Sequence, residues 1–167
     1  MNTASVSTMD TPIGPFTALV DGDGAVLASG WTTETDDLLT LVSPTLRPAR
    51  PRPRPELGEV TAAVLAYHRG ELAAIDPIAV RQRGGGFLEH AWEVLRGVPA
   101  GAPLSYTELA EKAGRPTAVR AAASACARNA TALFVPCHRV LRQDGTLGGF
   151  RWGLPVKRWL LDHESSR

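Results

Sequence analysis

The pair of residues in this sequence with the clearest capacity for chemistry is a cysteine followed directly by a histidine, Cys137-His138. A thiolate is the most nucleophilic side chain available near neutral pH, and an adjacent imidazole can act as its base. The competing interpretation is a buried structural cysteine beside a surface histidine. The flanking residues, Val135-Pro136 before the pair and Arg139-Val140 after it, favour the chemical interpretation.

The residues just before this pair indicate how it is positioned. The run 132–135 (ALFV) is short and apolar, which predicts a buried strand that leads toward Cys137. Pro136 then lacks a backbone donor and forces an extended or turning path, so we expect the cysteine where regular structure stops.

The cysteine count bears on the cellular setting and on metal binding. Cys126, the other cysteine, lies eleven residues before Cys137 in a predicted helix. This arrangement is more typical of a reduced intracellular protein than of a protein with a disulfide framework. The spacing of the two cysteines also does not match that of metal ligands. We therefore expect no metal and no cofactor, and we interpret Cys126 as structural.

Composition and charge bound the function further. A chain of 167 residues forms one domain or two small ones. It contains no run of 18 apolar residues, so the sequence predicts no membrane span. The first ten residues lack the basic and apolar regions of a secretion signal. The net charge of +1 conceals an asymmetry: residues 1–83 carry 7 Arg against 10 acidic residues, whereas residues 84–167 carry 11 Lys and Arg against 7 acidic residues. A basic C-terminal half is a modest indication of a polyanionic partner.

The N-terminal half has the pattern of a small sheet with helices. Two apolar segments around Asp23-Gly24, residues 16–20 and 25–31, predict a β-hairpin. Residues 1–9 are expected to be a loose tail, residues 36–42 and 56–69 helices, and residues 76–80 a strand. Proline alternates with arginine or alanine over residues 46–55, which predicts an exposed polyproline-type loop, with a DNA-contacting arm as the alternative.

The glycines at 84–86 mark the predicted boundary between a domain of residues 1–83 and a helical domain of residues 84–167. After a helix over residues 87–96, Ser105 and Glu108 form the pattern of a capping box that opens the next helix. A turn at Gly114 and a further helix over residues 117–128 complete a helix-turn-helix. This last helix has small residues around a single long cation, Arg120. The helix over residues 117–128 either forms a surface that approaches another molecule closely or is an ordinary alanine-rich helix.

Several ordered motifs together resemble the methylated-DNA–protein-cysteine methyltransferases, the O6-alkylguanine repair proteins. They are Ser105-Tyr106, the run 118–121 (AVRA), Asn129, the run 136–140 (PCHRV) and the run 145–153 (GTLGGFRWG). The runs AVRAAASACARN and DGTLGGFRWG are similar to the C-terminal methyltransferase half of the bacterial protein Ada. The resemblance covers about residues 87–164, and the N-terminal half resembles the family's smaller domain only loosely.

The resemblance implies a role for each of four catalytic residues. Cys137 would attack the alkyl carbon on guanine O6, and His138 would remove the thiol proton through a water molecule. Glu164 would hold the other imidazole nitrogen, although a solvated carboxylate at a helix end is the ordinary explanation. Tyr106 would donate its hydroxyl hydrogen toward guanine N3, with a place in the core as the alternative.

The resemblance also implies a DNA-binding and pocket set. Arg120 would enter the base stack from the minor groove and replace a flipped nucleotide, with Ala121 beside it. Asn129 would tie together the turns around the site unless it simply caps a helix. The pocket would be lined by Val140, Gly148, Phe150, Arg151 and Trp152. Phe150 stands where the family most often has tyrosine, so a pocket hydroxyl is missing.

These inferences predict an α/β (α+β) protein, with a ribonuclease H-like N-terminal domain and a winged-helix-like C-terminal domain. Its expected function is DNA repair by irreversible, single-turnover transfer of an alkyl group from O6-alkylguanine in double-stranded DNA to Cys137. We expect a cytoplasmic monomer that associates with the nucleoid when bound to DNA. The alternatives are a module that recognises alkylated guanine without repairing it and, more remotely, a cysteine hydrolase.

Overall fold

The computed structural model describes residues 3–165, which form a mixed α/β fold with two compact units. One unit consists of the described residues up to Arg83 together with Ala130–Phe134, and the other of Gly84–Asn129 together with the described residues from Val135 onward. The short segment 130–134 therefore belongs to the first unit, whereas the residues on both sides of it belong to the second.

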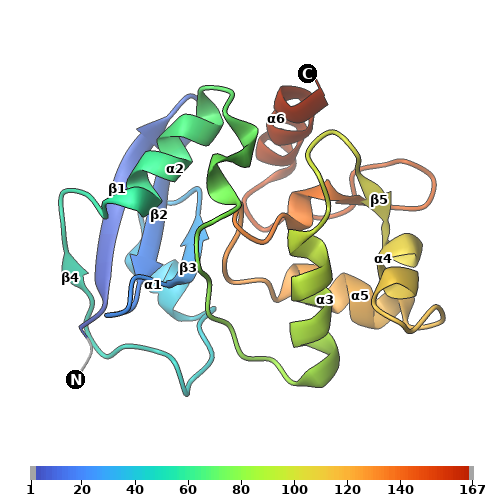
Figure 1. Cartoon of the computed structure of the whole chain (residues 1–167), viewed down its shortest axis with the longest axis horizontal. Helices are drawn as coiled ribbons and strands as arrows, with labels where there is room; N and C mark the ends of the chain where they lie inside the picture. The colour runs from blue at the N-terminus through green and yellow to red at the C-terminus, as the bar shows by residue number, and fades with distance from the viewer. Residues whose placement is uncertain (1–2, 166–167) are drawn as a thin grey trace. The chain divides into compact units, whose positions relative to one another are not determined.

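The first unit is built on a four-stranded sheet with strand order β3-β2-β1-β4 (Figure 1). The predicted hairpin is confirmed: β2 (Gly14–Val20) pairs antiparallel with β3 (Val26–Gly30). The prediction of a loose N-terminal tail was wrong in its described part, because β1 (Ser5–Thr11) pairs with β2 along its whole length. Val6 and Met9 of this strand are buried.

The proline-rich segment is not wholly a loop, since Arg52–Pro53 forms the edge strand β4, parallel to β1. The amides of Arg52 and Arg54 donate to the carbonyls of Ala4 and Val6, at 2.9 and 2.8 Å. Prolines at every second position leave the donors of the intervening arginines on one side of the chain. An edge strand needs donors on one side only, so this alternation is compatible with a sheet.

The helices of the first unit lie close to their predicted positions. They are α1 (Thr35–Leu39) and α2 (Glu59–His68), and α2 lies across the sheet next to β1 (Figure 1). The strand predicted over residues 76–80 is absent from the described chain. A short 3-10 helix, η1 (Leu72–Ile75), precedes it, and only Val80 bridges to Val26.

The apolar run before the cysteine is not a strand, which corrects that prediction. Residues 131, 132 and 135 form isolated bridges, and Leu133 adopts a left-handed conformation with φ of 81°. The segment is nevertheless held firmly in the first unit: Ser29 donates from its amide to Ala130 O (2.9 Å) and from its hydroxyl to Ala132 O (2.7 Å). Phe134 packs edge-on against Phe16, with ring centroids 6.5 Å apart.

The second unit is mainly helical. The helices predicted between residues 87 and 128 are confirmed with slightly different ends, and a further helix contains Glu164, where only a helix end was expected. They are α3 (Gly86–Arg96), α4 (Tyr106–Lys112), α5 (Val119–Ala127) and α6 (Leu154–Ser165). The first three of these helices lie against one another (Figure 1), and the indole of Trp92 on α3 donates to Ala125 O on α5 at 2.8 Å. The predicted capping box is present: Glu108 N donates to Ser105 Oγ at 3.0 Å, and Ser105 N donates to the Glu108 carboxylate at 2.9 Å.

Two short strands, β5 (Leu104–Ser105) and β6 (Val140–Leu141), pair in parallel in the second unit. Because α4 begins directly after β5, this pairing brings the start of α4 beside the chain that follows the cysteine. Among the described residues, no helix combines the length and apolar character needed to cross a membrane.

Candidate active site

Cys137 begins a short 3-10 helix, η2 (Cys137–Arg139), directly after Pro136. Its side chain is buried, with a residue exposure of 8%. Asn129 forms a hydrogen bond with the cysteine: its side-chain amide nitrogen donates to Val135 O at 2.8 Å and to Cys137 Sγ at 3.3 Å. One amide group therefore fixes the turn before the cysteine and also offers a hydrogen bond to the sulfur.

His138 lies in a buried network with Glu164 of α6 and Arg139. The imidazole Nε2 donates to Glu164 Oε2 at 2.8 Å. Arg139 forms a fork with the same carboxylate, at 2.9 Å to each oxygen, and donates to Val98 O at 2.7 Å. The other imidazole nitrogen, Nδ1, is buried and has no hydrogen-bond partner in the part of the chain that the structure describes. With Nε2 donating to the carboxylate, Nδ1 is the nitrogen free to accept a proton.

The electrostatics of this network favour a neutral imidazole and an ionised carboxylate. Burial lowers the pKa of His138 and outweighs the opposing effects of Glu164. Burial alone would raise the pKa of Glu164, but the hydrogen bonds and charges of His138 and Arg139 lower it far below its usual value. Because His138 is neutral, we attribute the ionisation of Glu164 chiefly to the permanently charged Arg139.

The cysteine itself is protonated at rest. Burial raises the pKa of its thiol, while the hydrogen bond from Asn129 and the charges of Lys157 and Arg151 lower it. The site thus holds a thiol that requires a base, next to a neutral imidazole with a free acceptor nitrogen. This arrangement suits generation of a thiolate on demand.

Tyr106 is the first residue of α4, and the parallel pairing of β5 with β6 sets its position. Burial raises the pKa of its hydroxyl to about 12, so the phenol stays protonated and can donate a hydrogen bond. Its hydroxyl lies close to the loop at Gly148, where an added Cβ would lie 3.0 Å from it. Gly148 also has a φ of +72°, so glycine is required there by both backbone and space.

The remaining predicted residues lie directly after η2, on α5 and in the glycine-rich loop of residues 145–153. Val140 is fully buried and follows η2, whereas Arg120 is exposed and Ala121 half-buried near the start of α5. Arg151 donates to Ala127 O at 2.8 Å, which ties the glycine-rich loop to the end of α5. Phe150 and Trp152 are half-buried in that loop. The structure therefore joins Cys137 to Asn129 and His138 to Glu164, and it leaves Arg120 outside this hydrogen-bonded group.

Sequence reasoning assigned no role to two buried charged residues, Arg139 and Lys157. Lys157 is 1% exposed and donates to the carbonyls of Val140 at 2.8 Å, Leu147 and Gly149. The sequence does hold a signal for it, because Lys157, Leu160 and Glu164 recur at helical spacing on the buried face of α6. Two charged residues on an apolar helix face point to buried partners.

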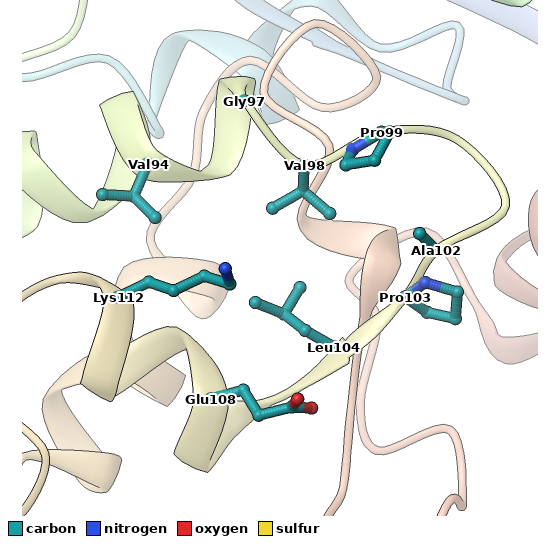
Figure 2. Close-up of a pocket in the computed structure, with 9 residues that line it drawn as sticks. All are labelled: Val94, Gly97, Val98, Pro99, Ala102, Pro103, Leu104, Glu108 and Lys112. Atoms are coloured by element: carbon teal, nitrogen blue, oxygen red, sulfur yellow. The ribbon is translucent and has the colours of Figure 1, made fainter.

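The second unit also contains a hollow of about 480 Å³ that is separate from the cysteine. It is lined by the end of α3, the following loop, β5 and α4, with Glu108 and Lys112 at one side (Figure 2). Its lining includes Val98, whose carbonyl accepts a hydrogen bond from Arg139. The described residues contain no group of three or more side chains suited to hold a metal ion.

Comparison with known proteins gives the family. Residues 86–166 match the 6-O-methylguanine DNA methyltransferase, DNA binding domain. Ada of Escherichia coli K12, a bifunctional transcriptional activator and DNA repair enzyme, is 52% identical over 83 residues, which are 50% of this chain and 23% of Ada. The chain therefore spans less than a quarter of the length of that relative.

Other relatives are matched over nearly their whole length. The methylated-DNA–protein-cysteine methyltransferase of Mycobacterium tuberculosis H37Rv is 37% identical over 163 residues, 96% of this chain and 92% of that protein. The crystal structure of the M. tuberculosis protein in complex with DNA superposes with a TM-score of 0.80 at 30% identity, covering 97% of this chain and 93% of that one.

The fold, with a buried cysteine beside an imidazole and a helix pair in the region that matches a DNA-binding domain, is that of the DNA-repair methyltransferases. The chain belongs to the methylated-DNA–protein-cysteine methyltransferase family. These relatives are methyltransferases, so the alternative of a non-catalytic recognition module is not supported.

Proposed function

We propose that this protein repairs O6-alkylguanine in double-stranded DNA by moving the alkyl group onto Cys137. The thiolate attacks the alkyl carbon in line with the C–O6 bond, so an S–C bond forms as the C–O bond breaks. The bonding electrons stay with the guanine. The product is a thioether, which has no good leaving group, so each molecule acts once.

The proton balance follows from the buried network. The thiol proton passes to Nδ1 of His138, through a bridging water, as the thiolate forms. Glu164 stabilises the resulting imidazolium through Nε2, with Arg139 holding the carboxylate in place. Tyr106 donates its hydroxyl hydrogen toward guanine N3, where it offsets the negative charge left on the departing base. Its raised pKa, about 12, supports the role of a donor.

We assign the walls of the substrate pocket to residues that come before and after Cys137 in the sequence. Asn129 keeps the turns around Cys137 in register, and Val140 offers main-chain groups to the guanine edge. The loop with Gly148, Phe150, Arg151 and Trp152 closes over the alkyl group. Phe150 contributes no hydroxyl, so the loop reads the base through its backbone.

Duplex DNA is engaged through the helix-turn-helix of α4 and α5. Arg120 is exposed on α5 beside small residues, so it can enter the minor groove and fill the space of an extruded nucleotide. We assign this region to a winged-helix-like domain of residues 84–167 and the preceding residues to a ribonuclease H-like domain. The protein is proposed to act as a monomer in the cytoplasm, without a cofactor.

Two observations support this proposal: the Asn129 amide donates a hydrogen bond to Cys137 Sγ, and the neighbouring residue His138 is buried, neutral and bonded to Glu164. The test is intact-mass analysis after mixing with duplex DNA that contains O6-methylguanine. We expect one added methyl mass, located on Cys137 by peptide mapping, and none on Cys137→Ala. Transfer beyond one equivalent, or transfer by the alanine variant, would contradict the proposal.

A further inference from the structure

Lys157 is a buried cation that the mechanism above does not use. It lies on α6 with 1% of its surface exposed. An ammonium group has three donors, and here all three are used by carbonyls, those of Val140, Leu147 and Gly149. All these partners are neutral, and none of the ion pairs in the described residues includes Lys157. An uncompensated charge in the interior is costly, which calls for a reason.

The three carbonyls come from two segments, one that follows the cysteine in the chain and one in the glycine-rich loop. Val140 follows η2 and lies three residues after Cys137, whereas Leu147 and Gly149 enclose Gly148. Gly148 is the point where the loop approaches the hydroxyl of Tyr106. A single ammonium group therefore holds the cysteine segment and the glycine-rich loop at a fixed separation.

The charge of Lys157 also acts on the cysteine. Burial raises the pKa of the Cys137 thiol, and Lys157 is among the groups that lower it. The interaction is mutual: burial lowers the pKa of Lys157, and the two cysteines raise it. A thiolate at Cys137 would be an anion in the interior with which this cation could pair.

We propose that Lys157 is a positioning residue for alkyl transfer, which holds the 147–149 loop against the cysteine segment and supplies positive charge to the Cys137 thiolate. This inference rests on the proposed function, because it assigns Lys157 a part in the same reaction. It also makes a claim about the free thiol that requires no DNA.

The other groups near the thiol permit a clean pH measurement. Burial raises the pKa of Tyr106 to about 12 and raises the pKa of Cys126 well above its ordinary value, so neither group ionises below pH 10. Glu164 is already ionised, and burial keeps His138 neutral above pH 7. The pH profile of Cys137 alkylation therefore reports on the Cys137 thiol, whose pKa burial raises, and on Lys157, whose pKa burial lowers.

The experiment compares wild type with Lys157→Met, Lys157→Gln and Lys157→Arg. Methionine removes both the charge and the hydrogen bonds, glutamine removes the charge and keeps a donor group, and arginine keeps the charge. Arg158→Met is the matched control, because Arg158 is exposed and adjacent on the same helix. The readouts are the rate of Cys137 alkylation by iodoacetamide from pH 6 to 10, located by peptide mass, and methyl transfer from DNA containing O6-methylguanine.

In the methionine and glutamine variants, the pH at which Cys137 reaches a given rate of alkylation should rise by about one unit. At pH 7 this corresponds to alkylation that is about tenfold slower than in wild type. Methyl transfer should fall at least as much, with glutamine recovering more than methionine at pH 9. Arginine and the control should keep the wild-type pH profile. An unchanged profile in the glutamine variant, which should fold even where methionine does not, would overturn the inference.

The two proposals fail in different ways. If wild type takes no methyl group from DNA while the variants still shift the iodoacetamide profile, the repair function is wrong and the charge assignment stands. If wild type transfers methyl normally and the neutral variants match it in both assays, the repair function stands and Lys157 has only a structural part.

Discussion

The carboxylate of Glu164 is the centre of a buried hydrogen-bond network. It accepts a hydrogen bond from His138 and a two-point fork from Arg139. The guanidinium keeps the carboxylate ionised, and the carboxylate fixes which imidazole nitrogen carries hydrogen. Burial then keeps the imidazole neutral, as the proposed transfer of the thiol proton to it requires.

The same network makes stability depend on pH. The folded pKa of His138 is below 6.5 because the residue is buried, so below about pH 6.5 the unfolded chain binds a proton that the folded protein does not. The free energy of unfolding should therefore fall by up to about 1.4 kcal/mol per pH unit below that point. Below about pH 4.5 a further loss should follow, since Glu164 resists protonation only when folded.

Urea denaturation at pH 8, 6, 5 and 4 measures this dependence. His138→Gln should flatten the decline between pH 6.5 and 4.5 and leave the earlier plateau in place. The buried His68 is unchanged in both proteins, so their difference isolates His138. Parallel curves for the two proteins would mean that His138 is not the group responsible.

At the scale of elements, two features that are far apart in sequence place Tyr106. The capping box starts α4 at this residue, and the pairing of β5 with β6 sets that start beside Val140. The loop then comes close to the hydroxyl at Gly148, which only glycine permits.

Gly148→Ala should slow methyl transfer by at least about tenfold, because the added methyl group meets the Tyr106 hydroxyl and strains a positive φ. Gly145→Ala is the matched control: it has a φ of +87° but no atom within 4 Å of an added Cβ. Both variants should lose similar stability in thermal unfolding, and only Gly148→Ala should lose the rate. Equal rate losses would show that backbone strain alone is responsible.

The second prediction at this scale concerns α5. Arg120→Ala should lose about tenfold or more of the transfer rate on duplex DNA and little with free O6-methylguanine, because a free base needs no extrusion. Arg128→Ala removes an exposed cation at the other end of the helix and should reduce both reactions little. The measurement is the second-order rate with each substrate. Equal fractional losses on the two substrates would assign Arg120 to folding or chemistry instead.

At the scale of the whole molecule, the notable segment is 130–134. It belongs to the first compact unit, although Asn129 and Val135 on either side belong to the second and are joined by a hydrogen bond of 2.8 Å. Leu133 and Phe134 are almost fully buried, and Ser29 and Gln82 bond to the neighbouring residues. The region matched by the family's DNA-binding domain therefore includes residues that complete the core of the first unit.

A fragment of residues 84–167 should consequently be unstable by itself. It would expose Leu133 and Phe134, each worth about 1.5–3 kcal/mol of burial. We expect a melting temperature at least about 10 °C below that of the whole chain, with loss of methyl transfer. Thermal unfolding by circular dichroism provides the measurement, with the full chain carrying Ser29→Ala as a milder control that removes one hydrogen bond. A fragment that unfolds cooperatively at the wild-type temperature, with full transfer, would contradict this expectation.

What the sequence by itself determined were features with local causes. The hairpin, the capping box, the helix pair and the adjacent residues Cys137-His138 each depend on residues within a few positions of one another, where turn chemistry and helical spacing decide the outcome. The family motifs are likewise contiguous, which is why the class of protein could be read from them.

The tertiary structure decided whatever depends on a distant partner. Residues 5–11 become a strand because β2 and β4 lie beside them, and Arg52 joins the sheet because Ala4 offers a carbonyl. The run before the cysteine bends at Leu133 because its hydrogen bonds go to Ser29, about one hundred residues away. The buried charges of Arg139 and Lys157 are tolerated only because the folded chain supplies a carboxylate to one and three carbonyls to the other. Such partners are absent from any local stretch of sequence, since it is folding that brings them within hydrogen-bond distance.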